Sequence, residues 1–483
     1  MTDEERQRVK DFILLNLGHT ATSDQSKACS QLVSFLYDDA PNAAFLLRGY
    51  AGTGKTSLVS ALIRSASAMQ LKTVLLAPTG RAAKVLSNYS RRKAFTIHKY
   101  IYVTTTDAGG SVHLSRRPNK HKYTLFIVDE ASMIGLTPQG FSAFGTNSLL
   151  DDLSEFVASG DHCRLLFVGD SAQLPPIGEA ESPALDSRFL TSALGLKVYE
   201  AELCEVVRQK NESRILENAT IIRQMIDSLT DDEPPMLPFF DSALQGDLQR
   251  LSGGELEEVL NREYSDRSEE DVVLICRTNK RANLFNQSIR NRVLFREGEI
   301  NAGDYLMVVK NNYHWLEVDS DIGFIANGDI VEVLSVRHHE ELYGFHFVEA
   351  SLRFVDYPDA PTLDCKIILE TLHSESPNLT SEESRMLYNA VAEDYADLSR
   401  ADRNRAVREN PYYNALQVKF AYALTCHKTQ GGQWDTVIVE QGYVTDEMLN
   451  KEYLRWLYTA LTRATRKVYL LNFEEKYFEF EEE

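Results

Sequence analysis

The chain has 483 residues, which is too long for one compact core, so we expect two to four folded domains. Of its residues, 43% are hydrophobic and 25% are charged. It has no apolar run long enough to span a membrane and no secretory-signal pattern at its start, so we expect a cytoplasmic protein with no membrane partner. The net charge of −20 argues, taken alone, against a nucleic-acid partner, and six scattered cysteines favour neither a disulfide framework nor a zinc site.

Short apolar runs alternate with helical segments along most of the chain. A helix is expected over residues 2–17 and another from Ser23 onward. Buried strands are expected at residues 45–47, 73–77, 125–128, 165–168, 272–275, 436–439 and 468–471. This alternation predicts an α/β protein whose parallel sheets are covered by helices on both faces. The strands suffice for two sheets, and the acidic stretch 231–271 is the expected place to divide them.

Two regions break the alternation. Residues 95–123 contain a β-branched run, a pair of glycines and a second short segment, which predicts a hairpin inserted into the first unit. Residues 301–413 begin with strand-like runs separated by glycines, which predicts a small β-barrel. Their later part, residues 381–410, is charged and poor in glycine and proline, and we expect it to be helical.

Basic residues are concentrated in one part of this acidic chain. Between Arg64 and Lys122 there are twelve lysines and arginines and a single acid, Asp107. Such a block is what a phosphate-contacting face would look like. A basic surface that is merely solvated fits the charge pattern equally well.

Residues 49–56, GYAGTGKT, match the phosphate-loop pattern G-x-x-x-x-G-K-[ST] in full. An expected strand precedes the loop and an expected helix follows it. The glycines let backbone N–H groups surround phosphate oxygens at a helix N-terminus. Lys55 is expected to hold the β- and γ-phosphates of ATP, and Thr56 is expected to bind Mg²⁺.

Polar side chains follow the next two buried strands. Asp129 and Glu130 end one of them, at the edge where parallel sheets bind ligands, so we expect Asp129 to hold Mg²⁺ and Glu130 to polarise the attacking water. Two acids that only cap the following helix are the plain alternative. Gln173 follows the other strand and can hydrogen-bond both water and a phosphate oxygen, although its Gly-Asp and Pro-Pro surroundings are equally typical of a turn.

An ordered set of motifs resembles the superfamily 1 (1B) helicases, in the RecD-like and Dda-like group. In the first half these are GYAGTGKT, APTGRAA (77–83), TIHKY (96–100), IVDEASM (127–133), VGDSAQLPPIG (168–178) and VVRQ (206–209). In the second half they are YALTCHKTQGGQWDTV (422–437) and YTALTRAT (458–465). They occur in the family's order over residues 25–471.

The resemblance implies two RecA-like lobes with ATP between them. It assigns residues 1–215 to the first lobe, with residues 95–123 as the pin hairpin that splits a duplex. Residues 216–300 and 413–483 then form the second lobe, and residues 301–412 an SH3-like β-barrel insertion that also contacts DNA. The helical segment 381–410 is longer than the family leads us to expect and is left without a role.

The resemblance also implies a set of ATP-site residues. The catalytic set is Lys55, Thr56, Asp129, Glu130, Gln173, Arg208 and Arg463, of which the two arginines reach the γ-phosphate. The nucleotide-binding set is Gln25, Gly49, Ala51, Gly52, Thr53, Gly54, Lys55, Thr56, Ser57 and Gly431, with Gln25 reading the adenine edge. Thr56 and Asp129 hold Mg²⁺. If residues 454–466 form one helix, the arginine at 463 lies on its polar face.

The strand-contacting residues that the resemblance implies are Pro78, Thr79, Arg81, His98, Thr425, His427, Lys428 and Gln430. Contacts of this kind position a strand without reading its sequence. Tyr100, Tyr102 and Trp434 are of the type that stacks on bases, although aromatic side chains more commonly pack in a core. One departure stands out, because Gly432 and Gln433 replace the Ser-Glu that the group commonly carries.

We therefore expect an ATP-dependent DNA helicase or translocase that tracks single-stranded DNA from 5′ to 3′. The expected ligands are ATP, Mg²⁺, single-stranded DNA and junctions of single- and double-stranded DNA. The setting is DNA repair or recombination, with replication or repair proteins as partners, and we expect a monomer. Two alternatives stay open: an ATP-gated clamp that binds a strand without unwinding, and an RNA helicase of the same superfamily.

Overall fold

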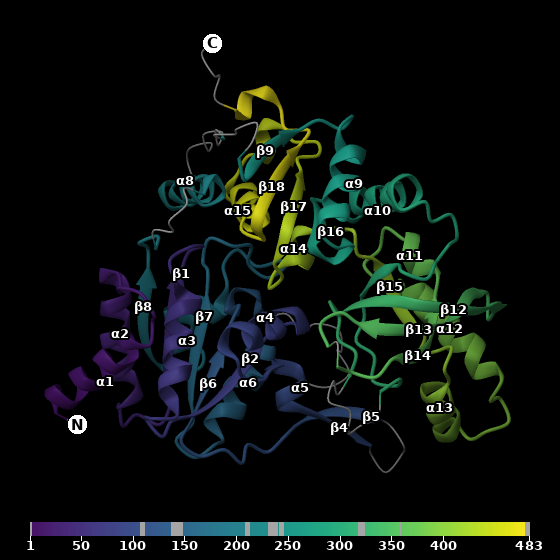
Figure 1. Cartoon of the computed structure of the whole chain (residues 1–483). Helices are drawn as coiled ribbons and strands as arrows, with labels where there is room; N and C mark the ends of the chain where they lie inside the picture. Colours follow the sequence, from purple (N-terminus) through teal and green to yellow (C-terminus); the bar gives the residue numbers. More distant parts are fainter. Residues whose placement is uncertain are drawn as a thin grey trace.

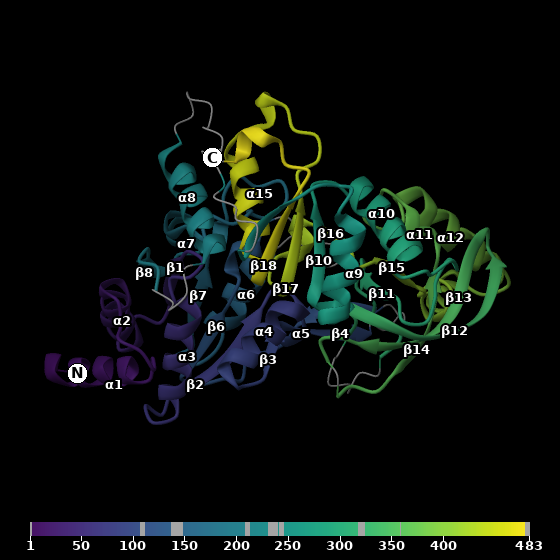
Figure 2. The same cartoon turned by 45° about the horizontal axis from the view of Figure 1, so that its top comes forward.

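The computed structural model describes residues 2–106, 112–136, 148–207, 213–229, 240, 246–316, 324–357 and 359–478. In Figure 1 the chain forms three bodies, with one sheet at the lower left, a second sheet at the top and a barrel at the right. Figure 2 shows the same bodies from another angle, with the barrel beside α9 and α10 of the second sheet.

The first sheet has six parallel strands in the order β3-β2-β6-β7-β1-β8. The strands are β1 (Ala43–Gly49), β2 (Lys72–Ala77), β3 (Ala94–Thr96), β6 (Thr124–Val128), β7 (Arg164–Gly169) and β8 (Lys197–Leu203). The helices are α1 (Asp3–Leu15), α2 (Ser23–Leu36), α3 (Lys55–Ala66), α4 (Gly80–Ser90), α5 (Ile97–Ile101), α6 (Leu149–Ala158) and α7 (Ser187–Ser192). Apolar residues of α1, α2 and α3 pack on one face of the sheet, and those of α5 and α6 pack on the other.

A two-stranded hairpin is inserted after α5. Strand β4 (Tyr102–Thr106) pairs antiparallel with β5 (Val112–Arg116), which lies where the sequence predicts the inserted hairpin. In Figure 1 the hairpin extends from the first sheet to a position below the barrel.

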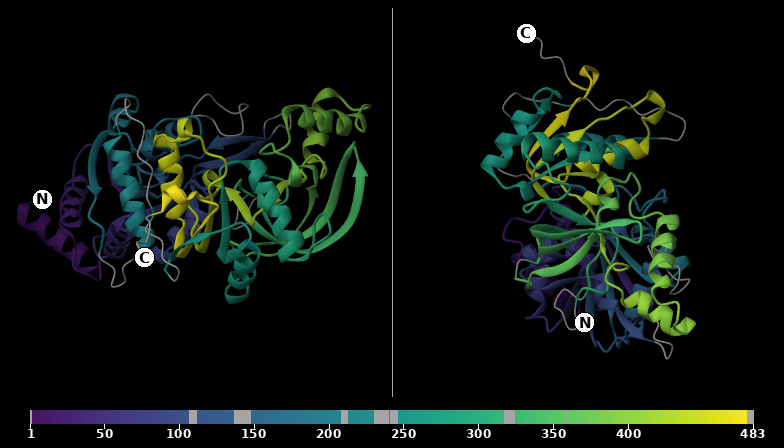
Figure 3. Two further views of the ribbon diagram at one scale, coloured as in Figure 1. Left: turned by 90° about the horizontal axis from the view of Figure 1, so that it is seen from above. Right: turned by 90° about the vertical axis from the view of Figure 1, so that its right-hand side faces the viewer.

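The second sheet has five strands, all parallel, in the order β16-β10-β17-β18-β9. They are β9 (Leu248–Leu251), β10 (Val272–Cys276), β16 (Ala423–Thr425), β17 (Trp434–Glu440) and β18 (Ala464–Leu471). One face is covered by α8 (Arg214–Ser228) and α15 (Lys451–Leu461), which lie side by side when the molecule is seen from above (Figure 3). The other face is covered by α9 (Leu256–Asp266) and α10 (Asn279–Ser288), and α14 (Cys426–Thr429) follows β16.

Two details of the second sheet differ from the sequence-based expectation. The acidic stretch expected to divide the sheets contains β9 and α9, which belong to the second sheet. The segment 454–466 is not one helix, because α15 ends at Leu461 and β18 begins at Ala464. The apolar residues of β18 from Val468 onward are buried in the sheet, so strand pairing overrides the helical periodicity there.

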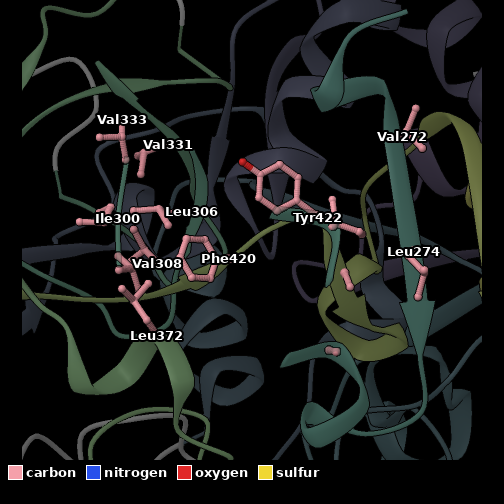
Figure 4. Close-up of a cluster of buried hydrophobic side chains, with 14 of the residues drawn as sticks. Val272, Leu274, Ile300, Leu306, Val308, Val331, Val333, Leu372, Phe420 and Tyr422 are labelled. Atoms are coloured by element: carbon pink, nitrogen blue, oxygen red, sulfur yellow. The ribbon is translucent and has the colours of Figure 1, made fainter. Parts of the chain in front are cut away.

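The barrel is closed by β11 (Tyr305–Val308), β12 (Ile330–Leu342), β13 (Phe345–Phe354), β14 (Leu363–Ile368) and β15 (Leu416–Phe420). Its apolar interior belongs to the same buried cluster as one face of the second sheet, and in Figure 4 Tyr422 lies between Phe420 of the barrel and Leu274 of the sheet. Between β14 and β15 lie α11 (Glu370–His373), α12 (Ser381–Glu393) and α13 (Arg400–Glu409), so segment 381–410 is helical as predicted. Leu387 and Val407 pack there against Phe347 of the β12–β13 ribbon.

This architecture confirms the predicted fold class: two parallel α/β sheets, a hairpin insertion in the first and a barrel insertion in the second. The exact boundaries between the two lobes and the barrel insertion, at residues 215, 300 and 412, stay predictions.

Candidate nucleotide site and nucleic-acid interface

The phosphate loop leaves β1 and enters α3. Gly52 and Gly54 have φ angles of 74° and 84°, and a Cβ on Gly54 would lie 2.3 Å from Nε2 of Gln25, so the loop has room only for glycine there. Lys55 Nζ donates to the carbonyl oxygens of Gly49 (2.6 Å) and Tyr50 (2.8 Å). The ammonium group is thus held at the mouth of the loop, where the first turn of α3 can accept an anion.

Gln25 supports this loop from α2. Its side chain is fully buried, its Nε2 donates to the Thr53 carbonyl at 3.2 Å, and its Oε1 accepts from the Thr22 N–H at 3.1 Å. Both ends of the amide are therefore used to join the helix to the loop. Its predicted contact with an adenine edge stays a prediction.

Two carboxylates lie at the end of β6. Asp129 Oδ2 accepts from the Tyr89 hydroxyl at 2.5 Å, and its Oδ1 accepts from the Glu130 N–H at 2.9 Å. Glu130 has a left-handed backbone with φ of 51°. Burial raises the pKa of both carboxyl groups, whereas Lys55 opposes that rise at each of them.

The end of β7 supplies Asp170 and Gln173, and both side chains are buried. Asp170 Oδ2 lies 3.7 Å from Lys55 Nζ and accepts from the Tyr458 hydroxyl at 2.7 Å. Oε1 of Gln173 has no hydrogen-bond partner among the described residues. This oxygen can therefore accept a hydrogen bond from a water or from a ligand.

Helix α15 brings the second sheet to these loops. The Tyr458 hydroxyl accepts from the Ala51 N–H at 2.8 Å, and Thr459 Oγ1 accepts from the Leu174 N–H at 2.9 Å. Arg463, in the turn after α15, is buried, and its Nη1 lies 3.9 Å from Glu130 Oε1. Residues on both sides of the interface therefore meet at the phosphate loop.

The sequence did not single out Tyr458, which contacts both the phosphate loop and Asp170. It lies in the YTALTRAT motif, just before Thr459, which precedes Arg463 by four residues. That spacing marks Thr459 and not Tyr458, so membership of the motif was the only signal for the tyrosine. The predicted catalytic residue Arg208 lies outside the described residues.

The predicted strand-contacting residues fall into two groups that face each other. In the first lobe Thr79 caps α4, with Oγ1 accepting from the Ala82 N–H at 3.2 Å. In the second lobe Gln430 Nε2 donates to the Leu174 carbonyl at 2.6 Å. A Cβ on Gly431 would lie 2.7 Å from the Cβ of Ala82, so the loop after α14 contacts α4 directly.

Arg81 and Trp434 join the same two elements. The Arg81 guanidinium lies 3.9 Å from the centre of the Trp434 ring, and its Nη2 donates to the Gln433 carbonyl at 3.2 Å. A Cβ on Gly432 would lie 2.6 Å from Trp434 Cη2 and 2.9 Å from Arg81 Cδ. The glycine that departs from the family pattern thus makes room for this stack. Trp434 is buried, so it packs rather than offering a free face to a base.

The remaining strand-contacting candidates are half-buried: Pro78, His98, Thr425, His427 and Lys428. Burial lowers the pKa of His98 to about 4, so its imidazole is neutral near pH 7. Burial also lowers the pKa of Lys428 to about 8. Tyr100 bonds to His121 (2.8 Å) and Tyr102 donates to Asp152 (2.6 Å), so both rings are anchored in the first lobe.

The barrel also reaches α4. Lys84 Nζ donates to the Val355 carbonyl at 2.8 Å and lies 3.5 Å from Asp356. A Cβ on Gly80, the first residue of α4, would lie 2.5 Å from Asp329 Oδ1. Helix α4 is therefore contacted by the second lobe and by the barrel.

No group of three or more His, Cys, Asp and Glu side chains within the described ranges has the arrangement of a metal-ion site. No helix within those ranges is long and apolar enough to cross a membrane.

A phosphate loop in one lobe, closed by a helix of the other, defines a two-lobed P-loop nucleotide-binding protein. The AAA domain family matches residues 20–229, and the UvrD-like helicase C-terminal domain family matches residues 420–471. With the ordered motifs, these matches make the chain similar to the RecD-like and Dda-like helicases of superfamily 1B.

Known proteins match over most of the chain. The ATP-dependent RecD2 DNA helicase of Deinococcus radiodurans is 26% identical over 428 residues, which cover 87% of this chain and 45% of that protein. The ATP-dependent DNA helicase dda of Enterobacteria phage T4 is 25% identical over 302 residues, 60% of this chain and 63% of that protein. The crystal structure of a Bacteroides Pif1 helicase with ADP-AlF3 and ssDNA has a TM-score of 0.47 at 15% identity, covering 96% of this chain and 95% of that chain.

The chain spans less than two thirds of the length of the RecD2 and Dda proteins.

Proposed function

We propose that the protein is an ATP-dependent DNA helicase that translocates from 5′ to 3′ along a single strand. The observation that carries this proposal is the double contact between the lobes. On one side α15 closes on the phosphate loop through Tyr458, and on the other side the loop after α14 closes on α4 through Gly431. A change in the distance between the lobes therefore acts on both sites together.

Hydrolysis is assigned to residues at the ends of β1, β6 and β7. Lys55 holds the β- and γ-phosphates, and Glu130 orients and polarises the attacking water. Gln173 accepts from that water through its unpaired Oε1 or donates to the γ-phosphate through its amide N–H. Arg463 approaches from the second lobe and stabilises charge that develops on the phosphoryl group. Arg208 is proposed for the same role from the first lobe.

Thr56 and Asp129 are proposed to hold Mg²⁺. Their hydroxyl and carboxylate oxygens are ligands of the type Mg²⁺ takes, at the first turn of α3 and at the end of β6. The ion would neutralise charge on the β- and γ-phosphates. The nucleotide would lie against Gly49, Ala51, Gly52, Thr53, Gly54, Ser57, Gly431 and Gln25.

The strand is proposed to cross α4 and α14, where Thr79, Arg81 and Lys428 supply hydroxyl and cationic contacts. Pro78, His98, Thr425, His427 and Gln430 would line the same path. The hairpin β4–β5 would act as the pin at a junction, and the barrel would contact the displaced or tracked strand. We propose the lobe boundaries at residues 215, 300 and 412 on the same basis.

The test is ATP-dependent unwinding of duplexes that carry a 5′ or a 3′ single-stranded tail, made in DNA and in RNA. Unwinding of the 5′-tailed DNA supports the proposal, and unwinding only from a 3′ tail refutes the polarity. Efficient unwinding of RNA would favour an RNA helicase. Strand binding without any displacement would favour an ATP-gated clamp.

Lys55→Ala serves as the matched control, because it removes the ammonium group from the phosphate loop. We expect hydrolysis and unwinding to be lost together. A Lys55→Ala protein with full ATPase activity would place the nucleotide site elsewhere.

A further inference from the structure

Tyr89 connects the helix proposed to contact the strand with a carboxylate proposed to hold the metal ion. It lies near the C-terminal end of α4, and its hydroxyl donates to Asp129 Oδ2 at 2.5 Å. Its backbone carbonyl accepts from Ser60 Oγ of α3, the helix that begins in the phosphate loop, at 3.3 Å. Tyr89 is thus held between the two elements that build the nucleotide site.

The other end of α4 faces the second lobe and the barrel. Arg81 stacks on Trp434, and Gly431 packs against Ala82. Helix α4 has eleven residues, so at about 1.5 Å per residue these contacts lie roughly 12 Å from Tyr89 along one continuous helix. A shift of the helix at one end is therefore transmitted to the other end.

Two hydrogen bonds orient the Asp129 carboxylate. Of its two carboxylate oxygens, Oδ1 is used by the neighbouring backbone N–H of Glu130, and Oδ2 is fixed by Tyr89. Groups that orient a metal-binding carboxylate typically affect metal affinity by 10- to 100-fold. Neither the family motifs nor the sequence pattern assigns this tyrosine a role.

We propose that Tyr89 is a positioning residue for Asp129, and that through it α4 links the strand-binding end of the first lobe to the metal- and nucleotide-binding end. The link from Tyr89 to the strand rests on the proposed function. The role of Tyr89 toward Asp129 depends only on the nucleotide site.

The test uses Tyr89→Phe, which removes one hydroxyl and keeps the ring. The matched control is Tyr199→Phe, because Tyr199 of β8 also donates to an aspartate, Asp38 Oδ2, at 2.6 Å in the same lobe but at a distance in the sheet from β6. Both variants are first compared with the wild type by thermal unfolding. Variants with the wild-type unfolding profile are taken further.

The first measurement is the affinity for fluorescent ADP with and without Mg²⁺. In the wild type Mg²⁺ should increase the affinity, and in Tyr89→Phe we expect that increase to fall about tenfold. The affinity without Mg²⁺ and the whole behaviour of Tyr199→Phe should stay within about twofold of the wild type. A Mg²⁺ response that is unchanged or larger in Tyr89→Phe overturns the positioning role, because the hydroxyl would then be irrelevant to the ion or compete with it.

The second measurement is the stimulation of ATP hydrolysis by oligo(dT), beside the affinity for the same oligonucleotide. We expect Tyr89→Phe to bind the strand as the wild type does and to lose most of the stimulation at saturating Mg²⁺. Full stimulation at saturating Mg²⁺ would refute the link through α4. A wild-type protein that binds no strand would instead refute the proposed function, and the ADP measurement would still decide the role of Tyr89 toward Asp129.

If Tyr89→Phe unfolds at a lower temperature than the wild type, Ser60→Ala provides a second variant. It removes the hydroxyl that holds the Tyr89 backbone and leaves the tyrosine intact. We expect a smaller loss of the Mg²⁺ response in the same direction, and no loss would count against the proposal.

Discussion

Replacing Asp329 by asparagine should make the protein more stable, and increasingly so as the pH rises. Asp329 lies in the turn before β12, with its side chain 2% exposed. Its Oδ2 accepts from the Ala326 N–H at 2.7 Å, whereas its Oδ1 has no hydrogen-bond partner among the described residues and faces Gly80 of α4. Burial, with a contribution from Asp356, raises its pKa from 3.8 to about 7.

The sign and size of the effect follow from that pKa. Between pH 3.8 and about 7 the folded protein keeps a proton on Asp329 that the unfolded chain loses, so this group lowers the free energy of unfolding as the pH rises. At 1.36 kcal/mol per pKa unit, the whole loss is roughly 4 kcal/mol, of which about 2 kcal/mol falls between about pH 5.5 and 8.5. Asparagine cannot ionise, so the free energy of unfolding of Asp329→Asn does not fall with pH through this residue.

The assay is urea unfolding of both proteins at about pH 5.5 and 8.5, followed by tryptophan fluorescence. The free energy of unfolding of Asp329→Asn minus that of the wild type should grow by about 2 kcal/mol between the two pH values. Asp359→Asn, at an exposed position in the same barrel, serves as the control and should show no such growth. A constant difference would mean that Asp329 is ionised in the folded protein, with the N-terminus of α4 and the nearby Lys99 stabilising its charge.

Three further changes test the contacts between the lobes and within the phosphate loop. Gly432→Ala places a methyl group against Trp434, so we expect the free energy of unfolding to fall by about 1–3 kcal/mol in urea denaturation, and an unchanged value would show that the ring can shift freely. Tyr458→Phe removes the hydroxyl that accepts from the Ala51 N–H, so we expect kcat for ATP hydrolysis to fall roughly tenfold. A wild-type kcat would contradict a role of Tyr458 in closing α15 on the phosphate loop. Gln25→Ala removes the side chain that supports the phosphate loop, so ADP affinity measured by calorimetry should fall about tenfold, and retained affinity would show that the loop holds its shape alone.

The sequence predicted the parts of the molecule that short segments specify. The phosphate loop, with Gly54 and Lys55, needs glycine torsions and a cation within eight residues, so its pattern is local. The buried strands were predicted because their apolar runs, such as β6 and β10, are covered on both faces and carry no polar interruption. Parallel order then brings Asp129 and Gln173 to the same edge of the sheet.

Contacts between distant segments could not be predicted in the same way. Tyr89 and Asp129 are forty residues apart, and Ala51 and Tyr458 more than four hundred, so no spacing in the sequence marks either pair. The sequence shows that Gly432 departs from the family pattern. It does not show that this glycine makes room for the stack of Arg81 on Trp434, because Arg81 comes from the other lobe. The helix expected to continue past Leu461 failed for a related reason, because pairing of β18 with two neighbouring strands decides that segment.

The two sets of contacts between the lobes are carried by elements that pack on each other. Helix α15, with Tyr458 and Thr459, reaches the loops of the nucleotide site, and the loop after α14, with Gly431, reaches α4. Cys426 of α14 is buried with Sγ 3.5 Å from the Trp456 carbonyl of α15, so the two helices are in direct contact. A displacement of the second lobe that loosens the hold on the phosphate loop must therefore shift the contact with α4 as well. The proposed coupling between nucleotide and strand would need no separate relay in the second lobe, since a close-packed interior transmits a displacement directly.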